Sequence, residues 1–269
     1  MKLGRFASVT VLAVFLVIGF VSYVTLFVFL RDHGGLRSSA VYGFLALYCL
    51  FCFIVCLVME PGQVPSHYVP DVEGEEIPGH EPGKNVANPR RCDSCCRQKP
   101  PRCHHCRLCR SCVLKMDHHC RWINNCIGHW NYKAFFNLVL FATLASCYSS
   151  VVFITRVYEK GWHFPGSSTA NFVYVTSGLV LLGLSLVLAS FLGWHVYLIA
   201  HNLTTIEYYE GVRARWLAKK SGQSYSHPFD LGIYRNVLSI LGPNVLLWFW
   251  PTAVGHLRDG TNFQVSRND

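Results

Sequence analysis

The sequence predicts an all-α polytopic membrane protein, with four transmembrane helices and a cytosolic cysteine-rich domain that binds two zinc ions between helices 2 and 3. Three observations lead to this prediction. Hydrophobic residues make up 51% of the chain and charged residues only 14%. The apolar residues gather in four long stretches without Asp, Glu, Lys or Arg. Cysteines and histidines gather in one segment between the second and third stretches.

The four uncharged stretches cover residues 6–30, 38–59, 134–155 and 161–206, and the last contains an apolar core at 172–200. A helix needs about 20 apolar residues to cross the hydrocarbon core of a bilayer, and every stretch reaches that length. A cleaved signal peptide is the alternative for the first stretch, because Lys2 and Arg5 precede it. A signal peptide has a core of about 7–15 residues and a small-residue cleavage site, so a retained helix is expected here.

The 24 Lys and Arg residues are unevenly distributed along the chain. Eleven lie between the second and third stretches, seven follow the fourth, and two precede the first. The positive-inside rule therefore predicts that both termini and the central segment are cytosolic. Topology and attraction to anionic lipid account for the net charge of +9, so no nucleic-acid partner is expected.

Composition divides the chain into five predicted parts, without an internal repeat. Residues 1–59 carry helices 1 and 2, residues 60–89 form an acidic cytosolic linker, and residues 90–133 form the cysteine-rich domain. Residues 134–200 carry helices 3 and 4, and residues 201–269 form a cytosolic tail. Two tail segments, 211–220 and 237–250, are expected at the membrane surface because they are apolar but too short or too basic to span it.

Nine of the thirteen cysteines lie from Cys92 to Cys126. On the reducing side of a membrane, cysteines mixed with histidines indicate metal binding rather than disulfides. Two Cys-x2-Cys pairs can each give two thiolates to a tetrahedral zinc, which predicts two structural zinc ions. The pairs are Cys92/Cys95 and Cys106/Cys109; the other candidate ligands are Cys96, Cys103, His104, His105, Cys112, His118, His119, Cys120 and Cys126.

These candidates outnumber the ligands that two closed zinc sites need, and the residues alone leave the pairing open. A surplus thiol beside a surplus histidine is either a nucleophile with its base or a pair of spare donors without a role. The surplus lies in Asp117-His118-His119-Cys120.

Around this tetrapeptide the chain resembles the DHHC family of protein palmitoyltransferases. The cysteine and histidine spacing agrees from Cys92 to Cys126, and Trp122, Asn125, Gly128 and Asn131 stand where the family has them. Thr204-Thr205-Ile206-Glu207 and His227-Pro228-Phe229-Asp230-Leu231-Gly232, with Asn236 beyond, resemble two further family motifs. Two departures concern packing rather than chemistry: Glu60-Pro61-Gly62 in place of Asp-Pro-Gly, and His227 in place of Asn.

The resemblance implies which residues bind zinc and which act in catalysis. One zinc takes Cys92, Cys95, His105 and Cys112, and the other takes Cys106, Cys109, His119 and Cys126; both sites are closed and structural. Cys120 is then the implied nucleophile, His118 its base and Asp117 the residue that orients the base. Thr205 is implied to position Asp117.

The implied reaction is protein S-acyl transfer in two steps, from long-chain acyl-CoA to Cys120 and then to membrane-proximal cysteines of protein substrates. A C16 chain exposes about 14 methylenes at about 0.8 kcal/mol each, so an enzyme in the membrane handles it best. Basic side chains are expected at the CoA phosphates, and Trp122 at the first acyl carbons. The basic set is Arg90, Arg91, Lys99, Arg102 and His104. The Golgi or the endoplasmic reticulum is the usual location in this family.

Three other functions agree less well with the sequence. A membrane-anchored RING-type ligase needs a Cys-x-His step followed by further Cys-x2-Cys pairs, and that order is absent. A transporter usually carries ionisable groups inside its spans, and the four stretches contain no Asp, Glu, Lys or Arg. A non-catalytic scaffold would not need Asp117, His118 and Cys120 together.

Overall fold

The computed structural model describes residues 8–31, 35–70, 91–160 and 167–266. Arg90 and most of the predicted acidic linker lie outside the described residues. The chain forms two compact units. The helical unit comprises Met1–Val58, Trp122–Asn124 and Ala134–His195, and the second unit comprises Met59–Arg121, Asn125–Lys133 and Val196–Asp269.

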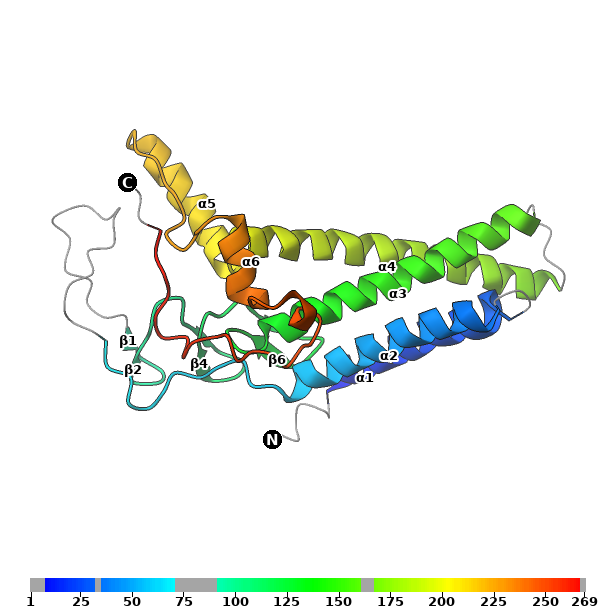
Figure 1. Cartoon of the computed structure of the whole chain (residues 1–269), viewed down its shortest axis with the longest axis horizontal. Helices are drawn as coiled ribbons and strands as arrows, with labels where there is room; N and C mark the ends of the chain where they lie inside the picture. Colours follow the sequence, from blue (N-terminus) through cyan, green and yellow to red (C-terminus); the bar gives the residue numbers. More distant parts are fainter. Residues whose placement is uncertain (1–7, 32–34, 71–90, 161–166, 267–269) are drawn as a thin grey trace. The chain divides into compact units, whose positions relative to one another are not determined.

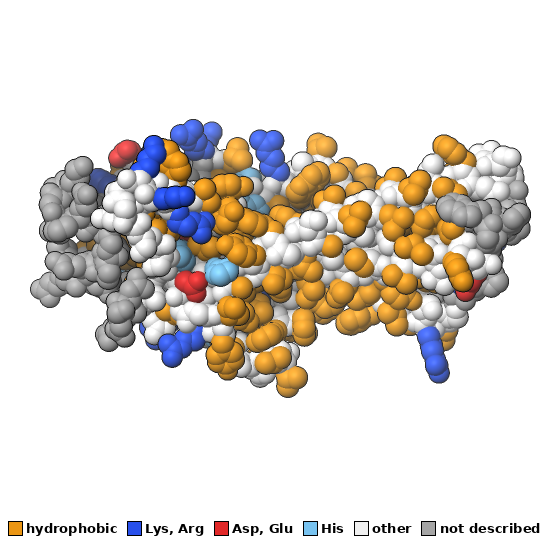
Figure 2. Space-filling model, turned by 90° about the horizontal axis from the view of Figure 1, so that it is seen from above, with side chains coloured by type: hydrophobic (Ala, Val, Ile, Leu, Met, Phe, Trp, Pro, Cys, Tyr) orange, Lys and Arg blue, Asp and Glu red, His pale blue; other side chains and the backbone are white. Residues whose placement is uncertain are grey.

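Four helices in the described part of the chain are long and apolar enough to cross a membrane. They are α1 (Val9–Tyr23), which continues as the π-helix η2 (Val24–Phe29), α2 (Leu36–Val58), α3 (Tyr132–Lys160) and α4 (Ser168–Ala200) (Figure 1). Figure 2 shows hydrophobic side chains along the sides of these helices. The prediction of a four-helix polytopic membrane protein is thus confirmed.

One apolar cluster holds the helical unit together and draws buried residues from all four helices. Its members are Val21, Val24, Phe29, Tyr42, Ala145, Phe153 and Leu181. Hydroxyl groups inside the unit pair with one another: Oγ1 of Thr25 lies 2.7 Å from Oγ of Ser149, and Oγ of Ser150 lies 2.7 Å from Oγ of Ser185. Such pairs suit a helix in lipid, where no water is available as a partner.

The cysteine-rich segment of the second unit folds into three short antiparallel hairpins. They are β1 (Arg91–Cys92) with β2 (Arg97–Gln98), β3 (His104–Cys106) with β4 (Ser111–Val113), and β5 (His118–Cys120) with β6 (Asn125–Ile127). Few aliphatic residues are available here, so hairpins this short need metal to hold them together.

Successive hairpins repeat every fourteen residues, which corrects the expectation of no internal repeat. The cross-strand pairs Cys92–Arg97, Cys106–Ser111 and Cys120–Asn125 occupy the same place in the three hairpins. The turn residues Cys96, Arg110 and Asn124 share a left-handed backbone, with φ of 52°, 52° and 50°. In the sequence this repeat is visible mainly at cysteine and histidine positions fourteen residues apart, such as Cys92, Cys106 and Cys120, while most of the residues between them differ.

The tail forms α5 (Thr205–Lys220), α6 (Ile233–Leu241) and a short 3-10 turn, η3 (Val245–Leu247). Asn236 anchors α6, because its amide donates to the carbonyl of Ala200 at 2.8 Å. The buried Lys133, which the sequence did not single out, donates from Nζ to the carbonyls of Leu241 and Ala253, both at 2.9 Å. The tail is therefore fixed to the ends of α3 and α4 by buried polar contacts.

Candidate active site

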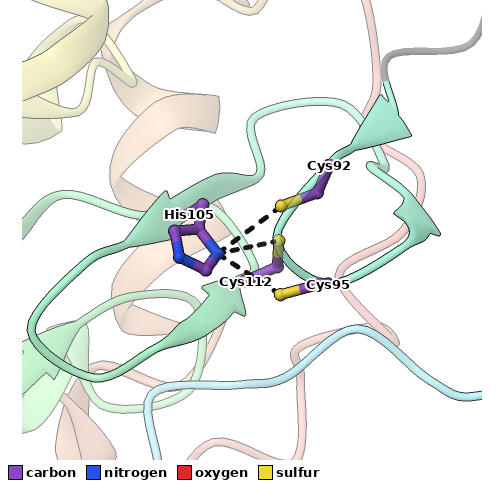
Figure 3. A group of neighbouring side chains, drawn as sticks. All are labelled: Cys92, Cys95, His105 and Cys112. Carbon is purple, nitrogen blue, oxygen red and sulfur yellow. Dashed lines mark hydrogen bonds between the residues drawn. The ribbon is translucent and has the colours of Figure 1, made fainter.

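Cys92, Cys95, His105 and Cys112 converge on one point in the second unit (Figure 3). Nδ1 of His105 lies 3.5, 3.3 and 3.8 Å from the sulfurs of Cys92, Cys95 and Cys112. A tetrahedral zinc with bonds of about 2.3 Å to sulfur and about 2.0 Å to nitrogen separates these atoms by about 3.5 Å. The four donors therefore fit one zinc ion.

A second cluster repeats this geometry with Cys106, Cys109, His119 and Cys126. Nδ1 of His119 lies 3.6, 3.4 and 3.5 Å from the three sulfurs, taken in chain order. Both clusters offer three thiolates and one imidazole and leave no open coordination position. Two zinc ions held here would contribute to folding and not to the reaction.

The hairpin register explains why the ligands interleave. His105 is the cross-strand partner of Cys112, and His119 is the cross-strand partner of Cys126. Each zinc cluster thus takes a Cys-x2-Cys pair from one hairpin and a facing His–Cys pair from the next. Two ions bound in this way would hold the three hairpins together.

Three of the other candidate donors lie outside both clusters. Cys96 is exposed and its thiol donates to the carbonyl of Asp93 at 3.4 Å. Cys103 is buried, and burial raises the pKa of its thiol to about 12, which makes it unreactive. His104 is half-buried on β3.

Asp117, His118 and Cys120 are also outside the clusters and lie next to one another on and before β5. Nδ1 of His118 lies 2.6 Å from Oδ2 of Asp117. Burial lowers the pKa of His118, but hydrogen bonds to Asp117 and Cys120, together with their charges, outweigh it and raise that pKa to about 9. The geometry suits an imidazole that carries a proton beside a thiolate.

Thr205, the first residue of α5, makes two hydrogen bonds to the carboxylate of Asp117. Its backbone N–H donates to Oδ1 at 2.8 Å and its hydroxyl donates to Oδ2 at 3.0 Å. Asp117 is almost completely buried, so these bonds and the one to His118 supply the partners that a buried carboxylate needs. The arrangement fixes the oxygen that faces His118.

Two residues that follow Cys120, Gly128 and Asn131, fix the backbone after the third hairpin. Asn131 accepts from the N–H of Gly128 at 2.9 Å and donates to the carbonyl of Cys126 at 2.9 Å. A Cβ at Gly128 would lie 2.6 to 2.9 Å from Val113 and from the carbonyls of Leu114 and Pro61, so only glycine fits there. Asn131 thus fixes the backbone of Cys126, the last ligand of the second cluster in the sequence.

The basic residues expected at the CoA phosphates do not share one environment. Arg91 is exposed, and Lys99 and His104 are half-buried. Arg102 differs from the expectation: its side chain is 1% exposed and its guanidinium binds Glu207 and Asn202. An arginine whose donors are already used inside the protein cannot also hold a phosphate. Trp122 belongs to the helical unit and is 62% exposed.

Comparison with known proteins agrees with this site. The sequence profile described as DHHC palmitoyltransferase matches residues 85–212, the segment that holds both clusters and Thr205. Probable protein S-acyltransferase 15 of Arabidopsis thaliana is 49% identical over 256 residues, which cover 93% of this chain and 99% of that protein. Probable protein S-acyltransferase 16 of the same plant is 45% identical over 267 residues, 96% of this chain and 93% of that protein. The chain belongs to the DHHC palmitoyltransferase family.

The similarity to a human relative covers a smaller share of both chains. Human palmitoyltransferase ZDHHC2 is 35% identical over 175 residues, 65% of this chain and 46% of that protein. The predicted family and the predicted enzyme class, a protein S-acyltransferase, are therefore confirmed. For this DHHC acyltransferase, sequence reasoning did not find the partners of Arg102 or the role of Lys133, because neither position carries a signal without its neighbours in space.

Proposed function

We propose that this DHHC acyltransferase takes a long-chain acyl group from acyl-CoA onto Cys120 and passes it to cysteines of protein substrates in a two-step, ping-pong reaction. The observation that carries the proposal is the separation of roles within one signature. His119 faces the second zinc cluster, whereas His118 faces Asp117 and leaves Cys120 outside both clusters.

The chemistry follows from these three side chains. His118 takes the thiol proton of Cys120, and Asp117 stabilises the imidazolium that results. The Cys120 thiolate forms a bond to the thioester carbonyl, the bond to the CoA sulfur breaks, and the proton on His118 neutralises the departing thiolate. In the second step, His118 takes the proton of a substrate protein thiol, and the resulting thiolate forms a bond to the acyl-enzyme carbonyl. The bond to the Cys120 sulfur breaks, and the proton on His118 returns to the Cys120 thiolate. Because one thioester replaces another, no nucleotide is needed.

Recognition of the donor is assigned to a smaller basic set than the sequence suggested. Arg91, Lys99 and His104 are proposed to contact the CoA phosphates, together with Arg90, which lies outside the described residues. Arg102 is not retained in this set. Trp122 is proposed to contact the first carbons of the acyl chain, since it follows Cys120 by two residues.

The zinc ions are proposed to be two per chain, with the ligands Cys92, Cys95, His105 and Cys112 in one site and Cys106, Cys109, His119 and Cys126 in the other. Both termini are proposed to face the cytosol of a Golgi or endoplasmic reticulum membrane, with the five-part division at residues 59, 89, 133 and 200. Protein substrates would present cysteines close to the bilayer. Exposed Leu246, Phe249 and Trp250 after α6 support a tail segment at the membrane surface.

The test is mass spectrometry of the purified full chain after incubation with palmitoyl-CoA. The expected result is one palmitoyl group on Cys120, removed by hydroxylamine and absent from Cys120→Ser. Acyl label that persists in Cys120→Ser at the wild-type level would show that another residue accepts the acyl group.

A further inference from the structure

Arg102 has a buried side chain, and its guanidinium makes four hydrogen bonds inside the protein. Its Nε and Nη2 donate to Oε1 and Oε2 of Glu207 at 2.6 and 2.7 Å, a bidentate pair. Nη1 donates to Oδ1 of Asn202 at 3.2 Å, and Nη2 also donates to the carbonyl of Asn202 at 2.7 Å. The guanidinium carbon lies 4.6 Å from the ring centre of Phe229 and 5.0 Å from that of Phe263. Among the described residues, every polar and aromatic partner of this guanidinium comes from the tail.

The partners of Arg102 are the residues that turn the chain from α4 into α5. Asn202 has a left-handed backbone, with φ of 47°, and the N–H groups of Asn202 and Leu203 donate to the carbonyls of Ile199 and Leu198. This is the Schellman ending of a helix, with asparagine in the position that glycine usually takes. Glu207 then completes the capping box of α5, since Thr204 and Glu207 each accept a hydrogen bond from the other's backbone N–H.

This capped turn places the first residue of α5 against Asp117. Thr205 lies between Thr204 and Glu207, the two residues of the capping box. Its backbone N–H and its hydroxyl both donate to the carboxylate of Asp117. Arg102 also contacts the residue before Asp117, because its own carbonyl accepts a hydrogen bond from the N–H of Met116 at 3.1 Å. One arginine therefore ties together the segment that carries Asp117 and the helix end that holds its carboxylate.

Backbone strain supports a functional reason for this arrangement. Arg102 and Lys115 have φ of 63° and 42°, in the left-handed region that side chains other than asparagine and glycine avoid. Nζ of Lys115 donates to the same Oδ1 of Asn202, at 3.0 Å. Each such backbone conformation lowers the stability of the folded state by about 1 kcal/mol or more, and strained residues of this kind occur mainly at functional sites.

We infer that Arg102 is a positioning residue for acyl transfer: through Glu207 and the N-terminus of α5, it sets the orientation of Asp117 and hence of His118. The inference rests on the proposed roles of Asp117, His118 and Cys120. It replaces the expectation that Arg102 binds CoA phosphates, and the two assignments differ in what they predict. A phosphate contact acts on the KM for acyl-CoA, whereas a positioning residue acts on the rate at saturating donor.

The experiment uses the full-length purified protein and measures acyl loading of Cys120 at varied palmitoyl-CoA. Arg102→Lys keeps the charge but loses the fork that binds both oxygens of Glu207, and Glu207→Gln keeps the shape but loses the charge. Each is expected to lower kcat roughly 10- to 100-fold, with KM within about two-fold of wild type. The double variant is expected to be no slower than the slower single variant, because the two residues act as one unit.

Two controls accompany these variants. Arg107→Lys makes the same chemical change at an exposed arginine of the same domain and should leave kcat and KM unchanged. Arg91→Ala, at a proposed phosphate contact, should raise KM and leave kcat within about two-fold. Zinc content is measured for every variant and should remain at two ions per chain.

Each other result contradicts the inference. A raised KM with normal kcat in Arg102→Lys would return the residue to phosphate binding, and unchanged kinetics would leave it without a role. Loss of zinc in Arg102→Lys would make the residue part of the fold and not a positioning residue. Failure of the wild-type protein to load Cys120 would instead overturn the proposed function, and this inference with it.

Discussion

The carboxylate of Asp117 receives both of its tail-derived hydrogen bonds from Thr205, one from the backbone N–H and one from the hydroxyl. The two residues are 88 positions apart in the sequence, and α3 and α4 lie between them. The N-terminus of α5 carries a partial positive charge, which favours the ionised form of the carboxylate. The orientation of His118, the proposed base, therefore depends on α5, a helix that follows α4.

The hydroxyl of Thr205 can be tested apart from its backbone N–H. Thr205→Val removes the bond to Oδ2 of Asp117 and keeps the shape of the side chain, so we expect loading of Cys120 to slow about 10-fold. Thr205→Ser keeps the hydroxyl and should restore most of the rate. Single-turnover loading with palmitoyl-CoA measures both. Equal rates in Thr205→Val and wild type would mean that the N–H alone holds Asp117.

Metal analysis tests the separation of the nucleophile from the zinc ligands. We expect two zinc ions per chain in the wild type and still two in Cys120→Ser, because Cys120 lies outside both clusters. Cys126→Ser should lose at least one ion and become sensitive to protease, since binding and folding are coupled in such small domains. A stoichiometry near one in Cys120→Ser would make Cys120 a ligand.

The sequence was sufficient for the parts that local spacing determines. The four spans follow from uncharged stretches of the required length, and the spacing from Cys92 to Cys126 carries the family. Arg102 could not be assigned in this way, because in sequence it is one more cation among many in a basic segment. Its partners, Asn202 and Glu207, lie beyond two further helices. Phe229 packs beside the guanidinium of Arg102 and the ring of Phe263, and its place in the tail motif does not reveal these contacts.

Removal of the proposed base should leave a protein that binds zinc but loads slowly. His118→Ala is expected to lower the single-turnover loading rate about 100-fold or more, the usual contribution of general acid–base catalysis. Added imidazole can occupy the space that the side chain leaves and should restore part of the rate. A variant that loads at the wild-type rate would show that another group takes the proton of Cys120.

The buried pair of Arg102 and Glu207 should contribute to stability over a defined pH range. Burial raises the pKa of Glu207, but the charge and hydrogen bonds of Arg102 outweigh it and lower that pKa from 4.5 to about 2. A lowered carboxyl pKa stabilises the folded state above the unfolded pKa, and this stabilisation is lost as the pH falls from about 4.5 towards 2. The shift corresponds to about 3 kcal/mol.

We therefore expect Glu207→Gln to melt at a lower temperature than wild type, with the same difference at every pH from about 6 to 8. Thermal unfolding in detergent at several pH values measures this difference. Arg156 and Glu159 form an exposed ion pair within α3, and Glu159→Gln is the matched control with an expected effect of less than about 1 kcal/mol. A difference that changes steadily between pH 6 and 8 would contradict the lowered pKa.

The fourteen-residue repeat of the hairpins relates the proposed nucleophile, Cys120, to the residues of the zinc clusters. Cys120 occupies the place in the third hairpin that Cys92 and Cys106 occupy as zinc ligands in the first two. Three residues on, where those hairpins have Cys95 and Cys109, the third has Ile123. The proposed nucleophile thus takes the first position of a Cys-x2-Cys pair in which the second cysteine is replaced by Ile123. Ile123→Cys should complete the Cys-x2-Cys pair, so that zinc or cadmium binds Cys120 and acyl loading requires a chelator. Loading at the wild-type rate without a chelator would contradict this relationship.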